Sequence, residues 1–278
     1  MATVWALCVR NLKDFVRNKT RLIFSVVFPF FFIYVFSAIF ADMMDVIENP
    51  MSYMLAGIAI ATVFDVTLRI SSSTIEDMSS GFMKEVLVSP VSRLSIAAGQ
   101  FLSGAVIGTL QGLVLLIGGV FLGLEITSVM TVVYMILVMI FVGLVFSGFG
   151  LFIATNTKST QTFQIVSVAI TMPMTFLSGA YIPLGSLPRV LEIVGFFNPL
   201  TYAVALFRAV SLEMLDAPRA FLIQAQLAIE IGDFVVTPWI AALFLLGFGV
   251  LFVLLSTVSF ARTDFSKMSR GAGEAMDW

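Results

Sequence analysis

The chain has 278 residues, of which 59% are apolar and 12% charged, compared with about 45–50% and about 25% in soluble domains. Its 15 Lys and Arg and 17 Asp and Glu are too few to cover a soluble surface, so the composition excludes a water-soluble globular protein. With no His and one cysteine, Cys8, it lacks the usual groups for acid–base catalysis, metal binding and disulfides, and a net charge of −2 argues against a nucleic-acid partner.

Residues 2–19 have the spacing of an amphipathic helix. Apolar side chains recur every three or four positions, with charged side chains between them. The apolar set is Trp5, Cys8, Val9, Leu12, Phe15 and Val16, and the charged set is Arg10, Lys13, Asp14 and Arg17. We expect this helix to lie in the cytoplasmic interface of a membrane, either as a brace for a partner or as a simple basic anchor.

Apolar runs of about 20 residues are long enough to cross some 30 Å of hydrocarbon. Six such runs predict an all-α polytopic membrane protein with six transmembrane helices: residues 22–41, 52–73, 96–122, 131–155, 162–182 and 238–260. Short connections join them, so residues 1–278 form one transmembrane domain. It divides into an interface helix (1–21), a six-span core (22–260) and a cytoplasmic tail (261–278).

The Lys and Arg residues outside the spans set the orientation. Eleven lie on the side that holds the N-terminal segment, the loops after the second and fourth spans and the tail, whereas three lie on the other side. Both termini are therefore expected to be cytoplasmic.

The cytoplasmic loop at residues 74–95 predicts a short surface helix. Glu76 and Asp77 stand near its start, Lys84 and Glu85 follow, and Pro90 ends it. Its position between two spans suits transmission of a mechanical push, and its composition fits an ordinary solvated loop equally well.

Two charges interrupt the second span. Asp65 and Arg69 are four residues apart, so they share a helix face and are expected to pair, as a gate or substrate contact or as a structural tie. In the third span, Gly104, Gly108 and Gly112 form a small-residue stripe for close helix packing. Polar side chains that line a path are expected at Gln111, Gln161, Gln164, Thr171 and Thr175, and Pro173 is expected to kink the fifth span.

The outer segment, residues 183–237, has apolar runs too short to span, cut by prolines. Residues 187–197 and 200–214 are predicted to be re-entrant helices that turn at Asn198 and Pro199. Tyr202 is then expected at the interface and Arg208 toward water. Residues 219–231 are expected to form a surface helix. The alternative to the re-entrant pair is a continuous surface loop with no gating role.

Two stretches resemble the type-2 permeases of ATP-binding-cassette exporters. GFMKEVLVSPVSRLSIAAGQ, residues 81–100, matches the family pattern at Gly81, Glu85, Leu87, Val88, Pro90 and Arg93. FLSGAYIPLGSLPRVLEIVGFFNPLTYAVALFRA, residues 176–209, matches it at residues 176–179, Pro183, Leu187, Pro188, residues 198–203 and Arg208. Many relatives carry an acidic residue between the tyrosine and the arginine, and this chain has none there.

The resemblance implies a half-transporter that pairs with a second permease chain, identical or homologous, and with two copies of a separate cassette ATPase. ATP and Mg would bind that ATPase, and no cofactor is expected in this chain, which has no phosphate-binding G-x-x-x-x-G-K-[ST] motif. The coupling element would comprise Glu76, Asp77, Gly81, Lys84, Glu85, Leu87, Val88, Pro90 and Arg93. The outer gate would comprise Asn198, Pro199, Tyr202 and Arg208. A prokaryotic cell membrane is the expected location.

The leading hypothesis is thus an exporter permease for an amphiphilic drug, lipid or glycan, powered by a partner. A proton-coupled secondary transporter that uses Asp65 as its carrier is the alternative, although the spans hold only one acid and no evident inverted repeat. An intramembrane enzyme lacks the necessary side chains.

Overall fold

Helices dominate the protein because a backbone surrounded by lipid must satisfy its own hydrogen bonds. A computed structural model describes residues 2–40, 50–79, 92–121, 124, 128–157, 159–232 and 234–262. The elements in chain order are α1 (Ala2–Arg17), α2 (Lys19–Phe40), α3 (Pro50–Ile70), α4 (Ser72–Ser79), α6 (Arg93–Phe121), α7 (Val129–Thr155), α8 (Thr160–Phe176), η2 (Leu184–Ser186), α9 (Arg189–Phe196), α10 (Pro199–Ser211), α11 (Arg219–Gln224), β1 (Ile229–Ile231), β2 (Phe234–Val236) and α12 (Pro238–Arg262).

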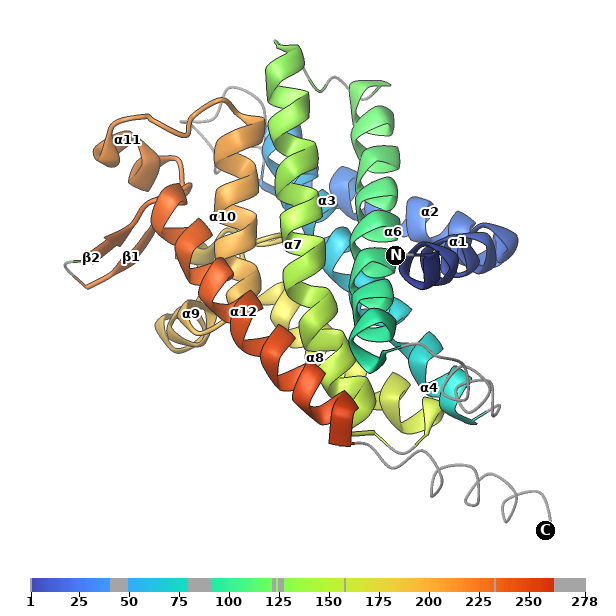
Figure 1. Cartoon of the computed structure of the whole chain (residues 1–278). Helices are drawn as coiled ribbons and strands as arrows, with labels where there is room; N and C mark the ends of the chain where they lie inside the picture. The colour runs from blue at the N-terminus through green and yellow to red at the C-terminus, as the bar shows by residue number, and fades with distance from the viewer. Residues whose placement is uncertain are drawn as a thin grey trace.

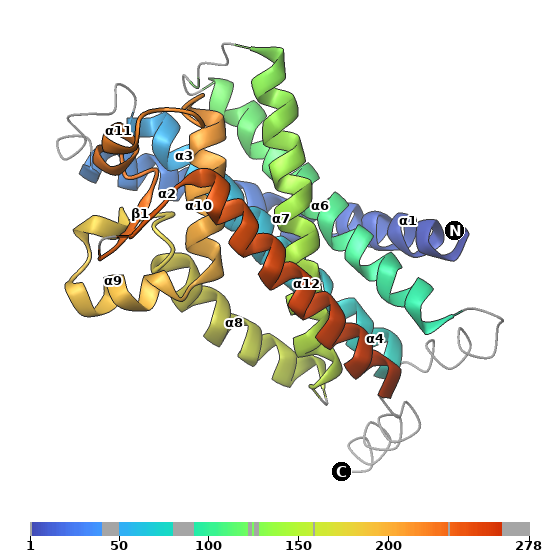
Figure 2. The same cartoon turned by 60° about the vertical axis from the view of Figure 1, so that its left-hand side comes forward.

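Helix α3 is the centre of the bundle. It packs against α2, α6, α7 and α10, and 83% of an apolar 18-residue stretch of this span is buried. In contrast, only 22% of such a stretch of α12 is buried, although α12 lies along α7 (Figures 1 and 2). The outer helices therefore present apolar faces outward, as a lipid environment requires.

Each predicted span coincides with a helix, and nearly all of the predicted ends are within a few residues of the helix ends. The exception is the end of the fifth span. Four described helices are long and apolar enough to cross a membrane, and the number rises to six if the bent pairs α1 with α2 and α9 with α10 each count as one span. The expected fifth span, 162–182, is shorter than predicted because α8 ends at Phe176 after 17 residues. At a rise of 1.5 Å per residue, α8 is about 25 Å long.

The outer segment forms the predicted helix pair and one element that was not predicted. Helices α9 and α10 meet at a bend of 85°. Asn198 caps α10, with its side chain accepting a hydrogen bond from the Leu200 amide, and Pro199 occupies the first turn. The expected helix at 219–231 is wrong beyond Gln224: Ile229–Ile231 pairs antiparallel with Phe234–Val236 instead, and Gly232, with φ of +62°, suits the hairpin turn.

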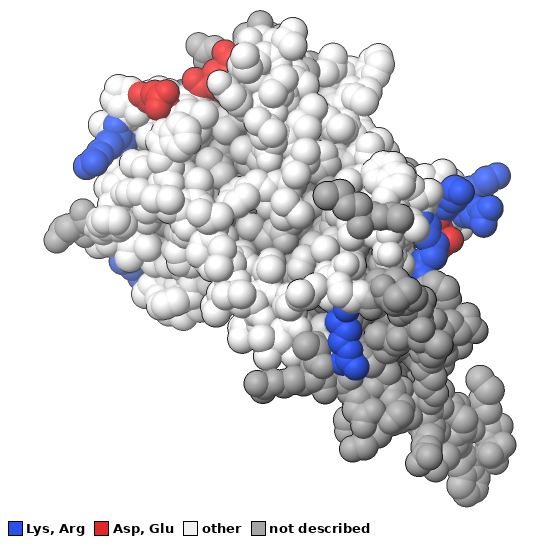
Figure 3. Space-filling model, in the orientation of Figure 1, with Lys and Arg blue, Asp and Glu red and all other residues white. Residues whose placement is uncertain are grey.

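Charged side chains lie around the edges of the face in Figure 3. The largest group of Lys and Arg lies beside α1, Asp and Glu lie at the upper left next to another basic side chain, and the middle of the face is uncharged. At the lower end in Figure 1, the start of α6 contacts the end of α12, where Arg93 Nη1 donates to the Phe260 carbonyl at 3.5 Å. The helix ends that were predicted to share the cytoplasmic side are therefore close together.

The glycine stripe of α6 packs within the chain. A Cβ at Gly104 would collide with Ser147 of α7, and one at Gly108 would collide with Thr67 and come within 3.1 Å of the Val63 carbonyl, both on α3. The Thr67 hydroxyl donates to the Gly104 carbonyl at 3.2 Å. These contacts confirm the predicted close helix packing, and they lie within one chain.

Gly108→Leu is therefore expected to destabilise the single chain. Overpacking costs about 1–3 kcal/mol, and we expect a marked loss of purified, monodisperse protein in detergent. Gly247→Leu is the matched control, since a Cβ at Gly247 of α12 would meet no atom within 4 Å. Equal yields and equal unfolding temperatures for both variants would contradict the packing seen here.

Candidate functional site: a groove between α2, α3 and α8

A large groove lies between α2, α3 and α8. Its volume is about 760 Å³, and it is lined by one face of each helix and by Tyr181 in the turn after α8. Ligand pockets for drug-sized molecules have about 300–1,000 Å³. The groove is thus of a size that accommodates a small amphiphile or part of a larger one.

Aromatic rings form one wall of the groove. Phe24 and Phe28 of α2 stack with ring centroids 5.5 Å apart, and Phe32 meets Tyr181 edge-on at 5.1 Å. Phe176, at the end of α8, packs on the same tyrosine at 5.4 Å. Sequence reasoning did not find this wall, although the i, i+4 spacing of the three α2 phenylalanines was its signal.

Helix α8 lines the groove with polar side chains set among apolar ones such as Val168 and Met172. Gln164, Ser167, Thr171 and Thr175 line the groove, whereas Gln161, a predicted path residue, does not. Gln111, also predicted, donates to the Ser25 carbonyl at 3.0 Å and does not line it. The hydroxyl of Ser167, a residue that the sequence reasoning omitted, is buried and has no hydrogen-bond partner among the described residues. A hydroxyl without a partner is costly to bury, so it is a donor that can serve a ligand.

The two charges of α3 also face the groove. Arg69 Nε donates to Asp65 Oδ2 at 2.8 Å, which confirms the predicted pairing. Their side chains are 52% and 33% exposed, so the pair is accessible from the groove. Aromatic rings, several polar side chains and one charge pair together can contact both the apolar and the polar part of an amphiphile.

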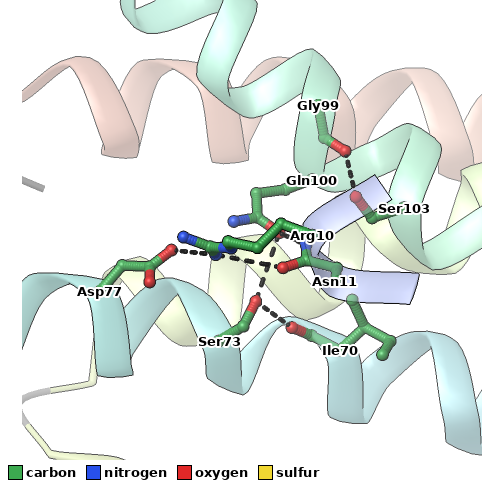
Figure 4. A network of polar contacts seen from close by, with 8 residues as sticks. All are labelled: Arg10, Asn11, Ile70, Ser73, Asp77, Gly99, Gln100 and Ser103. Atoms are coloured by element: carbon green, nitrogen blue, oxygen red, sulfur yellow. Dashed lines mark hydrogen bonds and ion pairs between the residues drawn. The ribbon is translucent and has the colours of Figure 1, made fainter. Parts of the chain in front are cut away.

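A polar junction joins α1, α4 and α6 at the predicted cytoplasmic end (Figure 4). Arg10 Nη2 lies 2.6 Å from Asp77 Oδ2, and Asn11 Nδ2 donates to Gln100 Oε1 at 3.0 Å. The Ser73 hydroxyl lies 3.4 Å from the same Gln100 oxygen. Helix α1 is therefore attached to the element that leads into the predicted coupling loop.

The buried face of α1 differs from the predicted apolar face. Cys8 and Phe15 are buried as expected, but Trp5 and Val16 are exposed, and Leu7 and Asn11 are buried in their place. The reason is the side on which α1 packs: a Cβ at Gly99 would lie 2.9 Å from Leu7 Cδ1, so α1 lies against α6 at Gly99, away from the stripe that faces α3 and α7.

Most of the predicted coupling residues lie outside the described residues. Glu76 and Asp77 belong to α4, and Arg93 begins α6. The remaining positions, outside the described ranges, are Gly81, Lys84, Glu85, Leu87, Val88 and Pro90.

The four predicted outer-gate residues all lie on α10 or at its cap, and all are buried. Asn198 Nδ2 donates to the Met174 carbonyl at 2.6 Å, and the Tyr202 hydroxyl donates to the Phe196 carbonyl at 2.6 Å. The expectation that Arg208 reaches toward water is wrong. Its side chain donates to the Tyr53 and Ala180 carbonyls, because α10 packs against α3 instead of lying on the surface.

Comparison with known proteins decides the class of this membrane protein. Residues 2–212 match the family model described as ABC-2 type transporter. The chain belongs to the ABC-2 type transporter family. It is thus a permease, the membrane subunit of an ATP-binding-cassette transporter, and a secondary transporter that uses Asp65 is not favoured.

Curated relatives of this ABC-2 permease agree in name. It is 26% identical over 208 residues to the putative transport permease ycf38 of Cyanophora paradoxa, with 72% of this chain and 71% of that protein covered. It is 26% identical to the probable multidrug ABC transporter permease YbhR of Escherichia coli K12, over 52% of this chain and 39% of YbhR. Nodulation protein J of Rhizobium leguminosarum bv. trifolii is 30% identical over 34% of this chain and 37% of its own length.

Proposed function

We propose that this ABC-2 permease exports an amphiphilic drug, lipid or glycan, and that the groove between α2, α3 and α8 is its half of the translocation path. The observation that carries the proposal is a largely apolar, aromatic-rich lining that also holds the polar side chains of α8 and the accessible Asp65–Arg69 pair. Such a lining matches a molecule that has an apolar part and a polar part.

The groove is open along one side. Several of the apolar side chains that line it on α2 and α8 are exposed, among them Phe24, Val168 and Met172. A second permease chain, identical or homologous, would close this side and complete the path. In this proposal both termini are cytoplasmic and the membrane is that of a prokaryotic cell. The contact between the start of α6 and the end of α12 supports placing the C-terminal tail on the same side as the loop before α6.

The power source in this proposal is a separate cassette ATPase, in two copies, which binds ATP and Mg. Its docking element is the segment from Glu76 to Arg93, and the junction of α1, α4 and α6 holds the start of that segment in place. The outer gate, in the same proposal, is formed by Asn198, Pro199, Tyr202 and Arg208, which are buried on α10 or at its cap, beside the largely exposed helix α9.

Glu85→Arg tests the docking element. A reversed charge in a charged contact is expected to weaken retention of the ATPase by about tenfold or more, without a change in the unfolding temperature of the permease. The measurement is ATPase activity that co-purifies with the permease in detergent, together with ATP-driven transport in vesicles. Lys13→Glu, a reversal on the exposed face of α1, serves as the control. Wild-type retention and transport in Glu85→Arg would contradict the assignment.

A further inference from the structure

Arg208 is a buried cation that no described carboxylate neutralises. Arg208 is only 2% exposed. It takes part in none of the ion pairs found among the described residues. Nε donates to the Tyr53 carbonyl and Nη2 to the Ala180 carbonyl, both at 3.1 Å, and Cζ lies 3.6 Å from the centre of the Tyr53 ring. A guanidinium has five N–H groups, and the two carbonyls accept from two of them, so three N–H groups are left for another acceptor. Buried charges normally meet a counter-charge.

The remaining donors face a cavity separate from the groove. This cavity has a volume of about 170 Å³ and is lined by Tyr53 of α3, the turn after α8, η2, α9, α10, α11 and β1. Nη1 of Arg208 makes no hydrogen bond to a described residue, and it lies 4.0 Å from where a Cβ would stand on Gly179, which also lines the cavity. The volume is below the roughly 300–1,000 Å³ of sites for drug-sized ligands, so the cavity suits one small polar group.

The backbone around the guanidinium leaves room for it and holds it in place. A Cβ at Gly57 would collide with Nη2 and lie 2.7 Å from the Ala180 carbonyl oxygen, so only glycine fits beside the charge. Gly179 has φ of +84°, a conformation that favours glycine. The cationic group is therefore fixed before any ligand arrives, which lowers the entropic cost of binding.

Two carboxylates also line the cavity. Glu192 is occupied by Arg189, whose Nη1 lies 2.8 Å from Glu192 Oε2. Glu230 stands on β1, in an exposed position. Its negative charge opposes an anion in the cavity, and this makes it a position at which the affinity can be changed without altering the buried core.

We propose that this cavity binds a single oxyanion of the phosphate class, held by the free guanidinium edge of Arg208. A guanidinium edge and a tetrahedral oxyanion match in geometry and charge. The oxyanion comes either from the head group of an anionic phospholipid or from free phosphate. This inference does not depend on the proposed transport function, because its test measures the unfolding of the chain alone and its cavity, lined by α9, α10 and β1, is distinct from the groove.

Thermal unfolding of the purified chain in maltoside detergent tests the site. One arm titrates inorganic phosphate against chloride at equal ionic strength, and the other adds phosphatidylglycerol or, as a neutral lipid, diacylglycerol to the micelles. We expect a saturable rise in unfolding temperature, because a ligand that binds only the folded state stabilises it. Glu230→Gln is expected to lower the half-saturating concentration by about two- to fivefold. Arg208→Gln is expected to abolish the response.

Asp216→Asn is the matched control, since it removes a carboxylate that accepts from Trp239 Nε1 and does not line the cavity. A response to phosphate identifies the free ion as the source, and a response to phosphatidylglycerol but not diacylglycerol identifies the lipid; either supports the site. If Arg208→Gln does not fold, the Glu230→Gln shift still decides the question. Absence of a saturable response in both arms, or a response that Glu230→Gln leaves unchanged, overturns the proposal.

Discussion

Replacing Gln164 by tryptophan is expected to reduce ATP-driven transport at least tenfold while ATPase binding persists. Gln164 lies on the exposed face of α8 and lines the groove, so the larger ring can occupy the groove without entering the packed core. A side chain that blocks the path removes transport without removing the energy source. The measurement is ATP-dependent accumulation of fluorescent amphiphiles in inverted vesicles, across cationic, anionic and zwitterionic probes.

Gln161→Trp is the matched control for this experiment. It places the same ring on the same helix less than one turn away, at an exposed position that does not line the groove. Near-normal transport in Gln161→Trp, together with loss in Gln164→Trp, separates obstruction of the path from a general effect of tryptophan on α8. Equal transport in the two variants would mean that the groove is not the path.

The spans were predictable because lipid imposes one rule on every residue that it surrounds. A run of apolar residues such as 131–155 has no stable alternative to a helix in hydrocarbon, and α7 begins at Val129 and ends at Thr155. The turn at Asn198 and Pro199 was predictable for a local reason, since proline fits the first turn of a helix and asparagine caps it. Both predictions rest on short-range physics.

Tertiary contacts were not predictable in the same way. Arg208 looked like a snorkelling side chain because its helix seemed to lie at a surface, but packing against α3 buries it beside Tyr53 and Ala180. The polar face of α8 was found in part, since Thr171 and Thr175 repeat at helical spacing. Its meaning depends on the facing aromatic wall of α2, more than 100 residues earlier in the chain. No local pattern links the two helices.

Reversal of the Arg10–Asp77 ion pair is expected to separate ATP hydrolysis from transport. The pair joins α1 to α4, and its side chains are only 29% and 13% exposed, so it is better shielded than a surface pair. Arg10→Asp or Asp77→Arg alone places two like charges in contact. On the proposed function, either single variant loosens the start of the docking segment and lowers the transport obtained per ATP by roughly three- to tenfold.

The double variant Arg10→Asp with Asp77→Arg is expected to restore at least half of the coupling, because the attraction returns with its direction exchanged. Lys13→Asp changes the same charge on an exposed face of α1 and is expected to leave coupling near the wild-type value. The readout is the ratio of transport to ATP hydrolysis in proteoliposomes, measured beside the unfolding temperature of each variant. If the single variants lower only the unfolding temperature, the pair is a structural tie. If they lower the ratio and the double variant restores it, the junction carries force between α1 and the segment that follows α4.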